Sequence, residues 1–203
     1  LALPLEDHQE LIDFTHKEGL NFITTPVSID ILKFLEELEG IDAYKVASMD
    51  LTNKSLLEGI SQTDKPIIMS TGMGSLEEIE MAVDIFKNCE LTILHCVSDY
   101  PLDPKNSALM NIVELKERYK ELKIGFSDHS LGHELSIAAI SLGAQVIEKH
   151  LTLDRNDKTF AEHHMSMEPD EFKTMVDWVR SIEDNLTNKG WTRSQDEKIN
   201  KKQ

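Results

Sequence analysis

Residues 126–153 read "FSDHSLGHELSIAAISLGAQVIEKHLTL". The segment holds two β-prone runs, and each run ends in a histidine, His129 in "FSDH" and His150 in "VIEKH". Between the runs, "GHELSIAAISLGA" carries apolar residues at helical spacing, and Gly143 falls where a helix gives way to the next strand. A strand, a helix and a second strand in this order are typical of a unit whose strands run parallel. We therefore expect both histidines at the same end of neighbouring strands.

The same alternation of runs and helical patterns extends over most of the chain. Six short runs rich in Ile, Val and Leu begin roughly 22 to 32 residues apart, a spacing typical of repeated βα units. Because the runs are nearly continuous in apolar residues, they indicate strands that are covered on both faces. They lie at residues 21–25, 43–48, 65–71, 91–97, 123–129 and 145–150. The sequence thus predicts an α/β fold around a parallel sheet.

Polar groups at the ends of the runs distinguish two kinds of parallel sheet. Each run ends, on its C-terminal side, in groups that can bind or react. A doubly wound sheet concentrates its ligands at one switch point, whereas a (β/α)8 barrel takes them from many strand ends. We therefore predict a truncated (β/α)8 TIM-barrel fold, in which the runs are strands 3 to 8 and the first two strands are absent. Residues 1–186 form this partial barrel, and the polar residues 187–203 are expected to be a linker or an irregular tail.

The composition excludes several classes of partner. The chain has 203 residues and a formal net charge of −16, which argues against a nucleic-acid or anionic-membrane partner because both select basic surfaces. No apolar run approaches membrane-spanning length. The two cysteines, Cys89 and Cys96, provide neither a disulfide framework nor a zinc-binding spacing. They predict buried thiols in a reducing compartment, and we expect a cytoplasmic protein.

His129 and His150 are the candidate metal ligands. Neighbouring strands lie about 4.8 Å apart, so histidines at the same end of adjacent strands can reach one ion. Imidazole together with hydroxyl or carboxylate oxygens suits Mn, Fe, Co or Zn better than Mg or Ca. A single histidine on a strand is more often structural, and this is how we interpret His95, which lies inside its run.

Lys45 stands in the otherwise apolar run "AYKVAS". A buried lysine is costly unless a partner balances its charge. Three interpretations remain open: an ion pair with an acid of the barrel, a contact to a phosphate or carboxylate, or an amine that forms a Schiff base. Small hydroxyl groups lie at the same ends of the runs and, with Lys45, predict a phosphate site. They belong to Thr25, Ser48, Ser70, Thr71 and Ser127.

Six motifs, taken in order, give the chain a specific resemblance. They are "YKVASMDLTN", "KPIIMSTGMGSLEEIEMAV", "LHCVSDYP", "GFSDHSLG", "AAISLGAQVIEKHLTLDRN" and "SMEPDEF". The series resembles the sialic acid synthase family, which includes N-acetylneuraminate, legionaminic acid and pseudaminic acid synthases, and it covers nearly all of residues 20–185. The resemblance implies a transferase that condenses phosphoenolpyruvate with an N-acetylated amino sugar, N-acetylmannosamine or a deoxy analogue. The implied products are a nine-carbon 2-keto sugar acid and phosphate.

The resemblance also implies roles for individual residues. His129 and His150 would hold a catalytic divalent ion, Mn2+ with Mg2+ or Co2+ as alternatives, that polarises the aldehyde oxygen of the sugar. Glu162 is nearest to the position of an aspartate that touches the sugar in the family, although "FAEHHMSMEP" lacks the family's glycine and proline. The implied contacts to phosphoenolpyruvate are Thr25, Lys45, Ser48, Ser70 and Ser127, and those between the two substrates are Ser98 and Tyr100.

The resemblance further implies parts that this sequence does not contain. Full-length family members homodimerise and carry a small antifreeze-like domain after the barrel. That domain and the first two barrel strands are expected outside the chain, with residues 187–203 leading toward the domain. Two alternatives remain open. The chain is a fragment without activity of its own, or it is another metal-dependent barrel aldolase that uses Lys45 as an imine-forming amine.

Overall fold

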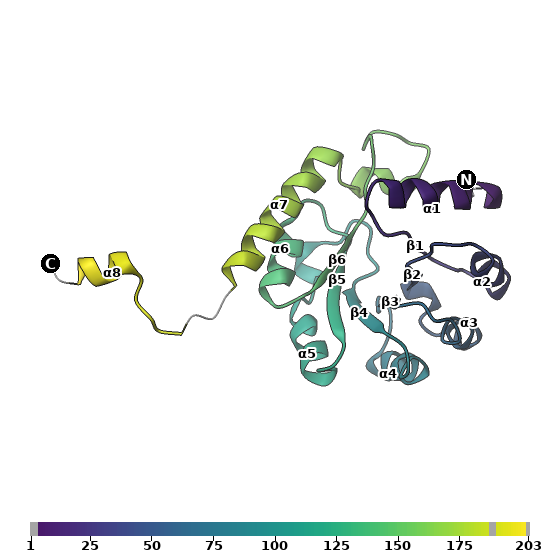
Figure 1. The fold of residues 1–203 in the computed structure, drawn as a ribbon, viewed down its shortest axis with the longest axis horizontal. Coiled ribbons are helices and arrows are strands. Elements are labelled where there is room, and N and C mark those ends of the chain that lie inside the picture. The colour runs from purple at the N-terminus through teal and green to yellow at the C-terminus, as the bar shows by residue number, and fades with distance from the viewer. Residues whose placement is uncertain (1–3, 187–189, 202–203) are drawn as a thin grey trace.

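The computed structural model describes residues 4–186 and 190–201. Its six strands form one parallel sheet whose strand order follows the chain. Figure 1 shows that the strands form a curled sheet with helices on its outer side. The strands are β1 (Ile23–Thr24), β2 (Ala43–Val46), β3 (Ile67–Ser70), β4 (Leu91–Cys96), β5 (Lys123–Asp128) and β6 (Val146–Lys149). The predicted α/β fold with a parallel sheet is confirmed, and the numbering of the strands within a complete barrel stays a prediction.

Helices connect the successive strands, as the repeated βα pattern predicts. Gly143 follows the helix between β5 and β6 with a φ of +94°, a left-handed value that glycine adopts without strain. Within the described ranges, no helix combines the length and the apolar character that a bilayer crossing needs. The α-helices are α1 (His8–Lys17), α2 (Ile29–Glu36), α3 (Lys54–Ile60), α4 (Leu76–Ile85), α5 (Met110–Arg118), α6 (Glu134–Ser141), α7 (Pro169–Asn185) and α8 (Gln195–Asn200), and the 3-10 helices are η1 (Leu5–Asp7), η2 (Ser48–Asp50), η3 (Pro104–Asn106) and η4 (Ala161–Met165).

The pairing register divides the strand side chains between two faces of the sheet. On the outer face, Tyr44 and Phe126 are fully buried in the core that the sheet forms with the helices. On the inner face, Ser127 of β5 is paired with Cys96 of β4 and with Glu148 of β6. Because successive residues of a strand point to opposite faces, polar inner residues alternate with core residues. The inner face is therefore where polar side chains of several strands meet.

The C-terminal segment differs in part from the irregular tail that we expected. Residues 195–200 form α8, which begins with a capping box between Ser194 and Glu197. Two backbone donors are satisfied by this pair of side chains, so a short polar sequence can start a helix here. Figure 1 shows α8 leading away from the rest of the chain. The remaining tail residues 187–189 and 202–203 lie outside the described residues.

Replacing Ser75 with alanine is expected to lower the free energy of unfolding by about 1 kcal/mol. Ser75 Oγ accepts the N–H of Glu78 at 3.3 Å, and the Glu78 carboxylate accepts the N–H of Ser75 at 2.7 Å, which caps the start of α4. Urea unfolding measures the loss. Ser141→Ala, on the exposed side of α6, is the matched control and should change stability by less than about 0.5 kcal/mol. Equal losses for the two variants would contradict the capping role.

Candidate functional site

A polar cluster on the inner face of the sheet surrounds Lys45. The buried Lys45 ammonium donates to Ser70 Oγ at 2.8 Å and to the carbonyl of Val46 at 3.0 Å, and it lies 3.5 Å from Glu148 Oε2. The other oxygen of Glu148 accepts the hydroxyl of Ser127 at 2.6 Å. Of the three interpretations of Lys45, the ion pair with an acid is the arrangement that this structure contains. The ammonium thus has two hydrogen bonds and one longer ion pair, and the Glu148 ion pair is the contact that an incoming anion would most directly compete with.

Glu148 is a member of this cluster that we did not select from the sequence. Its side chain is 39% exposed and links β6 to both β2 and β5 through Lys45 and Ser127. The sequence does contain a signal for it: Glu148 precedes His150 by two residues, as Ser127 precedes His129, and residues two apart on a strand share a face.

His129 and His150 lie side by side just after β5 and β6, as predicted. The centroids of their rings are 5.3 Å apart and the ring planes meet at 73°. His129 Nδ1 donates to the carbonyl of Val97 at 2.9 Å, and His150 Nδ1 lies 3.4 Å from Glu162 Oε2. Burial lowers the pKa of His150, and the nearby Glu162 carboxylate opposes that shift. The net shift favours the neutral form of the His150 ring.

The histidine pair fits a metal ion in part. Metal-binding histidines usually engage their second ring nitrogen with a carbonyl or a carboxylate, and both Nδ1 atoms lie next to such groups. In the described part of the chain, neither Nε2 atom forms a hydrogen bond, so no hydrogen-bonded protein group occupies that side of either ring. No group of three or more His, Cys, Asp or Glu side chains among these residues is close enough to hold a metal. The pair thus offers two imidazole ligands, and further ligands would have to come from elsewhere.

Tyr100 lies against the histidine pair, and Ser98 and Ser48 lie close to Gly72 in the neighbouring loops. The ring of Tyr100 stacks on His129 with centroids 4.3 Å apart and meets the ring of His150 edge-on at 6.2 Å. Ser48 Oγ accepts the N–H of Gly72 at 3.0 Å. A Cβ at Gly72 would collide with Ser98 Oγ, so a glycine is needed here for the close approach of these loops. Ser98 Oγ is buried next to Tyr100 and forms no well-aligned hydrogen bond among the described residues, so its hydroxyl can turn toward a ligand.

Two of the predicted hydroxyl residues, Thr25 and Thr71, form no hydrogen bond with Lys45 or Glu148 among the described residues. Thr25 follows the edge strand β1 and is half-buried, and no hydrogen bond joins it to Lys45 within the described residues. Thr71 Oγ1 donates to the carbonyl of Leu94 on the neighbouring strand at 3.0 Å, so its hydroxyl has a structural role.

The structural interpretation of His95 also agrees with its position. Its Nε2 bonds the carbonyl of Ser107 at 2.7 Å, and burial lowers its pKa.

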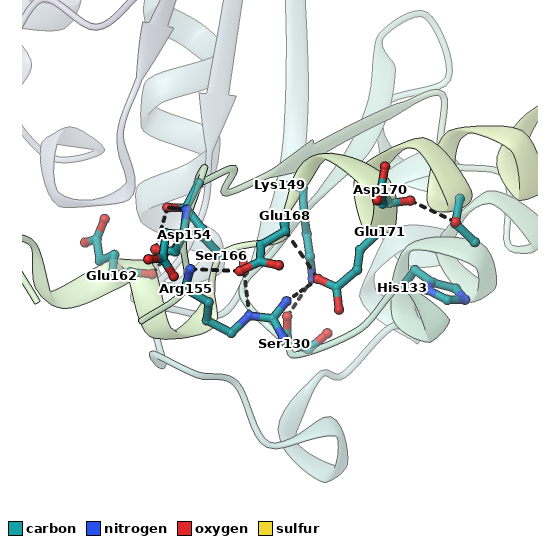
Figure 2. Close-up of polar contacts among 12 residues, drawn as sticks. Ser130, His133, Lys149, Asp154, Arg155, Glu162, Ser166, Glu168, Asp170 and Glu171 are labelled. Atoms are coloured by element: carbon teal, nitrogen blue, oxygen red, sulfur yellow. Dashed lines mark hydrogen bonds and ion pairs between the residues drawn. The ribbon is translucent and has the colours of Figure 1, made fainter. Parts of the chain in front are cut away.

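A buried ion pair joins β5 and β6 on the outer face, directly beside the two histidines. Asp128 and Lys149 are 3.0 Å apart, and their side chains are 0% and 1% exposed. Asp128 accepts the N–H and hydroxyl of Ser130 and the hydroxyl of Ser136, while Lys149 donates to the carbonyl of Ser130 at 2.6 Å. Figure 2 shows Lys149 above Ser130. Since each member precedes a histidine by one residue, the pair fixes the relative position of the two histidines.

The chain matches known proteins over nearly its whole length. The profile of the NeuB family matches residues 1–190. The chain is 39% identical over 188 residues to the N,N'-diacetyllegionaminic acid synthase of Campylobacter jejuni, covering 90% of this chain and 55% of that protein. It is 33% identical over 180 residues to the human N-acetylneuraminate-9-phosphate synthase, covering 88% of this chain and 50% of that protein. The chain thus spans about half the length of these curated relatives.

Solved structures resemble the fold closely. The N-acetylneuraminic acid synthetase of Leptospira borgpetersenii, crystallised with citrate, has a TM-score of 0.90 and 34% identity, covering 98% of this chain and 70% of that one. A truncated 3-deoxy-D-arabino-heptulosonate 7-phosphate synthase of Thermotoga maritima has a TM-score of 0.77 at 20% identity over 92% of this chain and 74% of that one, a likeness of fold alone. The curled parallel sheet of Figure 1 therefore has the same arrangement as in these synthase structures.

Proposed function

This chain belongs to the NeuB family, and from that membership we propose that it contributes the binding sites of a phosphoenolpyruvate-dependent synthase. The reaction would join phosphoenolpyruvate to an N-acetylated amino sugar, form a nine-carbon 2-keto sugar acid and release phosphate. One observation carries the proposal: the buried Lys45 lies in one polar cluster with Ser70 and Glu148, on the face of the sheet to which the histidine pair belongs.

Lys45 is the cation that we assign to the phosphate or carboxylate of phosphoenolpyruvate. A chain with a net charge of −16 needs a local positive group to hold an anion. An incoming oxyanion would replace the Glu148 contact of Lys45 with a charge-assisted hydrogen bond. Ser127, which now donates to Glu148, could then donate to the ligand. The further hydroxyls that we propose as contacts to phosphoenolpyruvate are those of Thr25, Ser48 and Ser70.

His129 and His150 would hold the divalent ion. We propose Mn2+, because two imidazole ligands completed by oxygen ligands suit this ion. When bound there, the ion would act as a Lewis acid on the aldehyde oxygen of the amino sugar. Glu162, next to His150, and Tyr100, stacked on His129, would flank the sugar. The buried hydroxyl of Ser98, next to Tyr100, would donate to one of the substrates.

The bond changes of the proposed reaction balance with water as the third reactant. The enol carbon of phosphoenolpyruvate forms a bond to the aldehyde carbon, and the aldehyde oxygen takes up a proton. Water adds to the carbon that carries the phosphate and leaves a hydroxyl group on it. The carbon–oxygen bond to phosphate then breaks as this hydroxyl becomes the 2-keto group, and its proton leaves with the phosphate. The added water has to lose a proton, and Glu148 is the carboxylate of the Lys45 cluster that can accept it.

Lys45→Met is expected to weaken the binding of phosphoenolpyruvate by at least about tenfold, because a hydrogen bond to a charged group contributes about 1.5–3 kcal/mol. Titration calorimetry of the parent chain should give saturable binding with which the variant is compared. Lys33→Met, which removes an exposed lysine paired with Asp30, is the control and should bind as the parent does. If Lys45→Met bound phosphoenolpyruvate as tightly as the control, the assignment of Lys45 would be wrong.

Turnover separates the proposed reaction from its alternatives. The chain would be incubated with phosphoenolpyruvate, Mn2+ and a panel of N-acetylated amino sugars that includes N-acetylmannosamine and deoxy analogues. Phosphate release that depends on the sugar, with a nine-carbon acid detected by mass spectrometry, would support the synthase. Borohydride trapping of pyruvate on Lys45 would instead indicate an imine-forming aldolase. Binding without turnover would indicate a fragment that needs the rest of a synthase.

A further inference from the structure

The segment between β6 and α7, residues 150–168, carries Glu162 to the histidine pair. We call this segment the β6–α7 loop. Met167 N–H donates to the carbonyl of His150 at 2.9 Å, and Thr152 N–H donates to the carbonyl of Met167 at 2.8 Å, so the two ends of the loop are joined. Between them, η4 places Glu162 Oε2 at 3.4 Å from His150 Nδ1. The position of Glu162 therefore depends on how the middle of the loop is held.

Arg155 holds the middle of this loop against the first turn of α7. Its guanidinium forms an ion pair with Glu171 and donates from Nε to the carbonyl of Ser166 at 3.2 Å. Its backbone N–H donates to Glu168 Oε1 at 3.0 Å. Glu168 and Glu171 form the capping box of α7, so Arg155 is attached to a rigid helix start. Figure 2 shows Arg155 beside Glu168 and Ser166, with Glu162 further along the loop.

Ser166 connects the Arg155 contact to Glu162. The Ser166 N–H and hydroxyl both donate to the carbonyl of Glu162, at 3.2 and 2.8 Å. The carbonyl of the same serine accepts from Arg155 Nε. Through these hydrogen bonds, Ser166 links the backbone of Glu162 to Arg155, which is itself bound to the capping box of α7. A second tether, between Thr152 Oγ1 and His163 Nδ1 at 2.7 Å, fixes the neighbouring residue to the start of the loop.

We propose that Arg155 is a positioning residue that sets the place of Glu162 over His150 and thereby the affinity of the site for its amino sugar. This inference rests on the proposed function. The Arg155 and Glu171 side chains are 37% and 47% exposed, and exposed ion pairs contribute little to global stability. Arg155 instead fixes the position of the loop, because its planar guanidinium can hydrogen-bond a carboxylate and a carbonyl at the same time. A lysine ammonium does not have this planar arrangement of donors.

The test compares Arg155→Lys and Arg155→Met with the parent chain of 203 residues. Amide hydrogen exchange should become at least about tenfold faster in the β6–α7 loop of both variants, with the strands β4 to β6 unchanged. In turnover assays, KM for the amino sugar should rise about tenfold or more, whereas KM for phosphoenolpyruvate stays within about twofold. Arg180→Lys and Arg180→Met are the matched controls, because Arg180 forms an exposed ion pair with Glu183 further along α7.

Each outcome of these measurements supports or overturns the positioning role of Arg155. Faster exchange confined to the loop, together with a selective rise in KM for the sugar, supports the positioning role. Unchanged loop exchange, faster exchange throughout the sheet, or equal changes in both KM values overturn it. If the parent shows no turnover with any sugar, the proposed function is what fails. The exchange pattern then decides alone: a loop-confined increase supports the role of Arg155, and any other pattern overturns it.

Discussion

Lys149→Met is expected to lower the free energy of unfolding by about 3–5 kcal/mol, the range measured when one partner of a buried ion pair is removed. The substitution leaves the Asp128 carboxylate in a site where both side chains are almost fully buried. Ser130 and Ser136 still donate to that carboxylate, but hydroxyl groups do not balance its charge. Desolvation lowers the pKa of Lys149 in the folded chain, and the Asp128 carboxylate is the main group that opposes this shift.

Urea unfolding of three variants measures this contribution. Lys173→Met on α7 is the matched control, because Lys173 forms an exposed pair with Asp177, and it should cost less than about 1 kcal/mol. The double variant Asp128→Asn, Lys149→Met removes both charges and should recover much of the loss, since no unpaired charge remains. A double variant no more stable than Lys149→Met would show that the uncompensated charge is not the cause.

The double variant His129→Ala, His150→Ala is expected to abolish saturable binding of Mn2+. The two imidazoles lie side by side with both Nδ1 atoms next to an oxygen and both Nε2 atoms without a hydrogen bond among the described residues. Removing a residue that only orients a metal ligand typically costs 10–100-fold in affinity, so the loss of one ligand should cost at least about a hundredfold. Titration calorimetry with Mn2+ alone measures both the single and the double variants.

The control for this titration is His8→Ala, which removes a histidine from α1. It should bind Mn2+ as the parent does. Binding that survives in the double variant would place the ion elsewhere. Binding lost in only one single variant would show that the two histidines do not share one ion. Circular dichroism of each variant confirms that the parallel sheet is retained.

The sequence predicted the strands and their order well. The six apolar runs coincide with β1 to β6, and the repeated alternation with helices identified a parallel sheet. It also predicted that His129 and His150 would meet, because the carboxyl ends of neighbouring parallel strands lie at one edge. The tail was predicted less well. A capping box at Ser194 starts α8 there, and such a local signal is outweighed by polar composition when a whole segment is assessed.

The partners of single side chains could not be predicted in the same way. Glu148 is both the acid that pairs with Lys45 and the acceptor for Ser127. Its place two residues before His150 indicates which face of the strand it shares, but not which groups it contacts there. Asp128 stands in the same triplet as Ser127 and His129, and the structure turns it to the opposite face toward Lys149. Arg155 lies in a loop, where no periodicity indicates which group it contacts.

By itself, the sequence determined the βα repeat, the parallel sheet and the meeting of two histidines at its edge. These follow from local periodicity and from the fixed geometry of parallel strands. The tertiary structure decided which alternating residues face inward, that Lys45 pairs with Glu148, and that Arg155 ties Glu162 to α7. The Lys45 pair joins strands of different βα units and depends on the curl of the sheet. The Arg155 contacts lie within one unit and depend on the path of its loop, which no local pattern encodes.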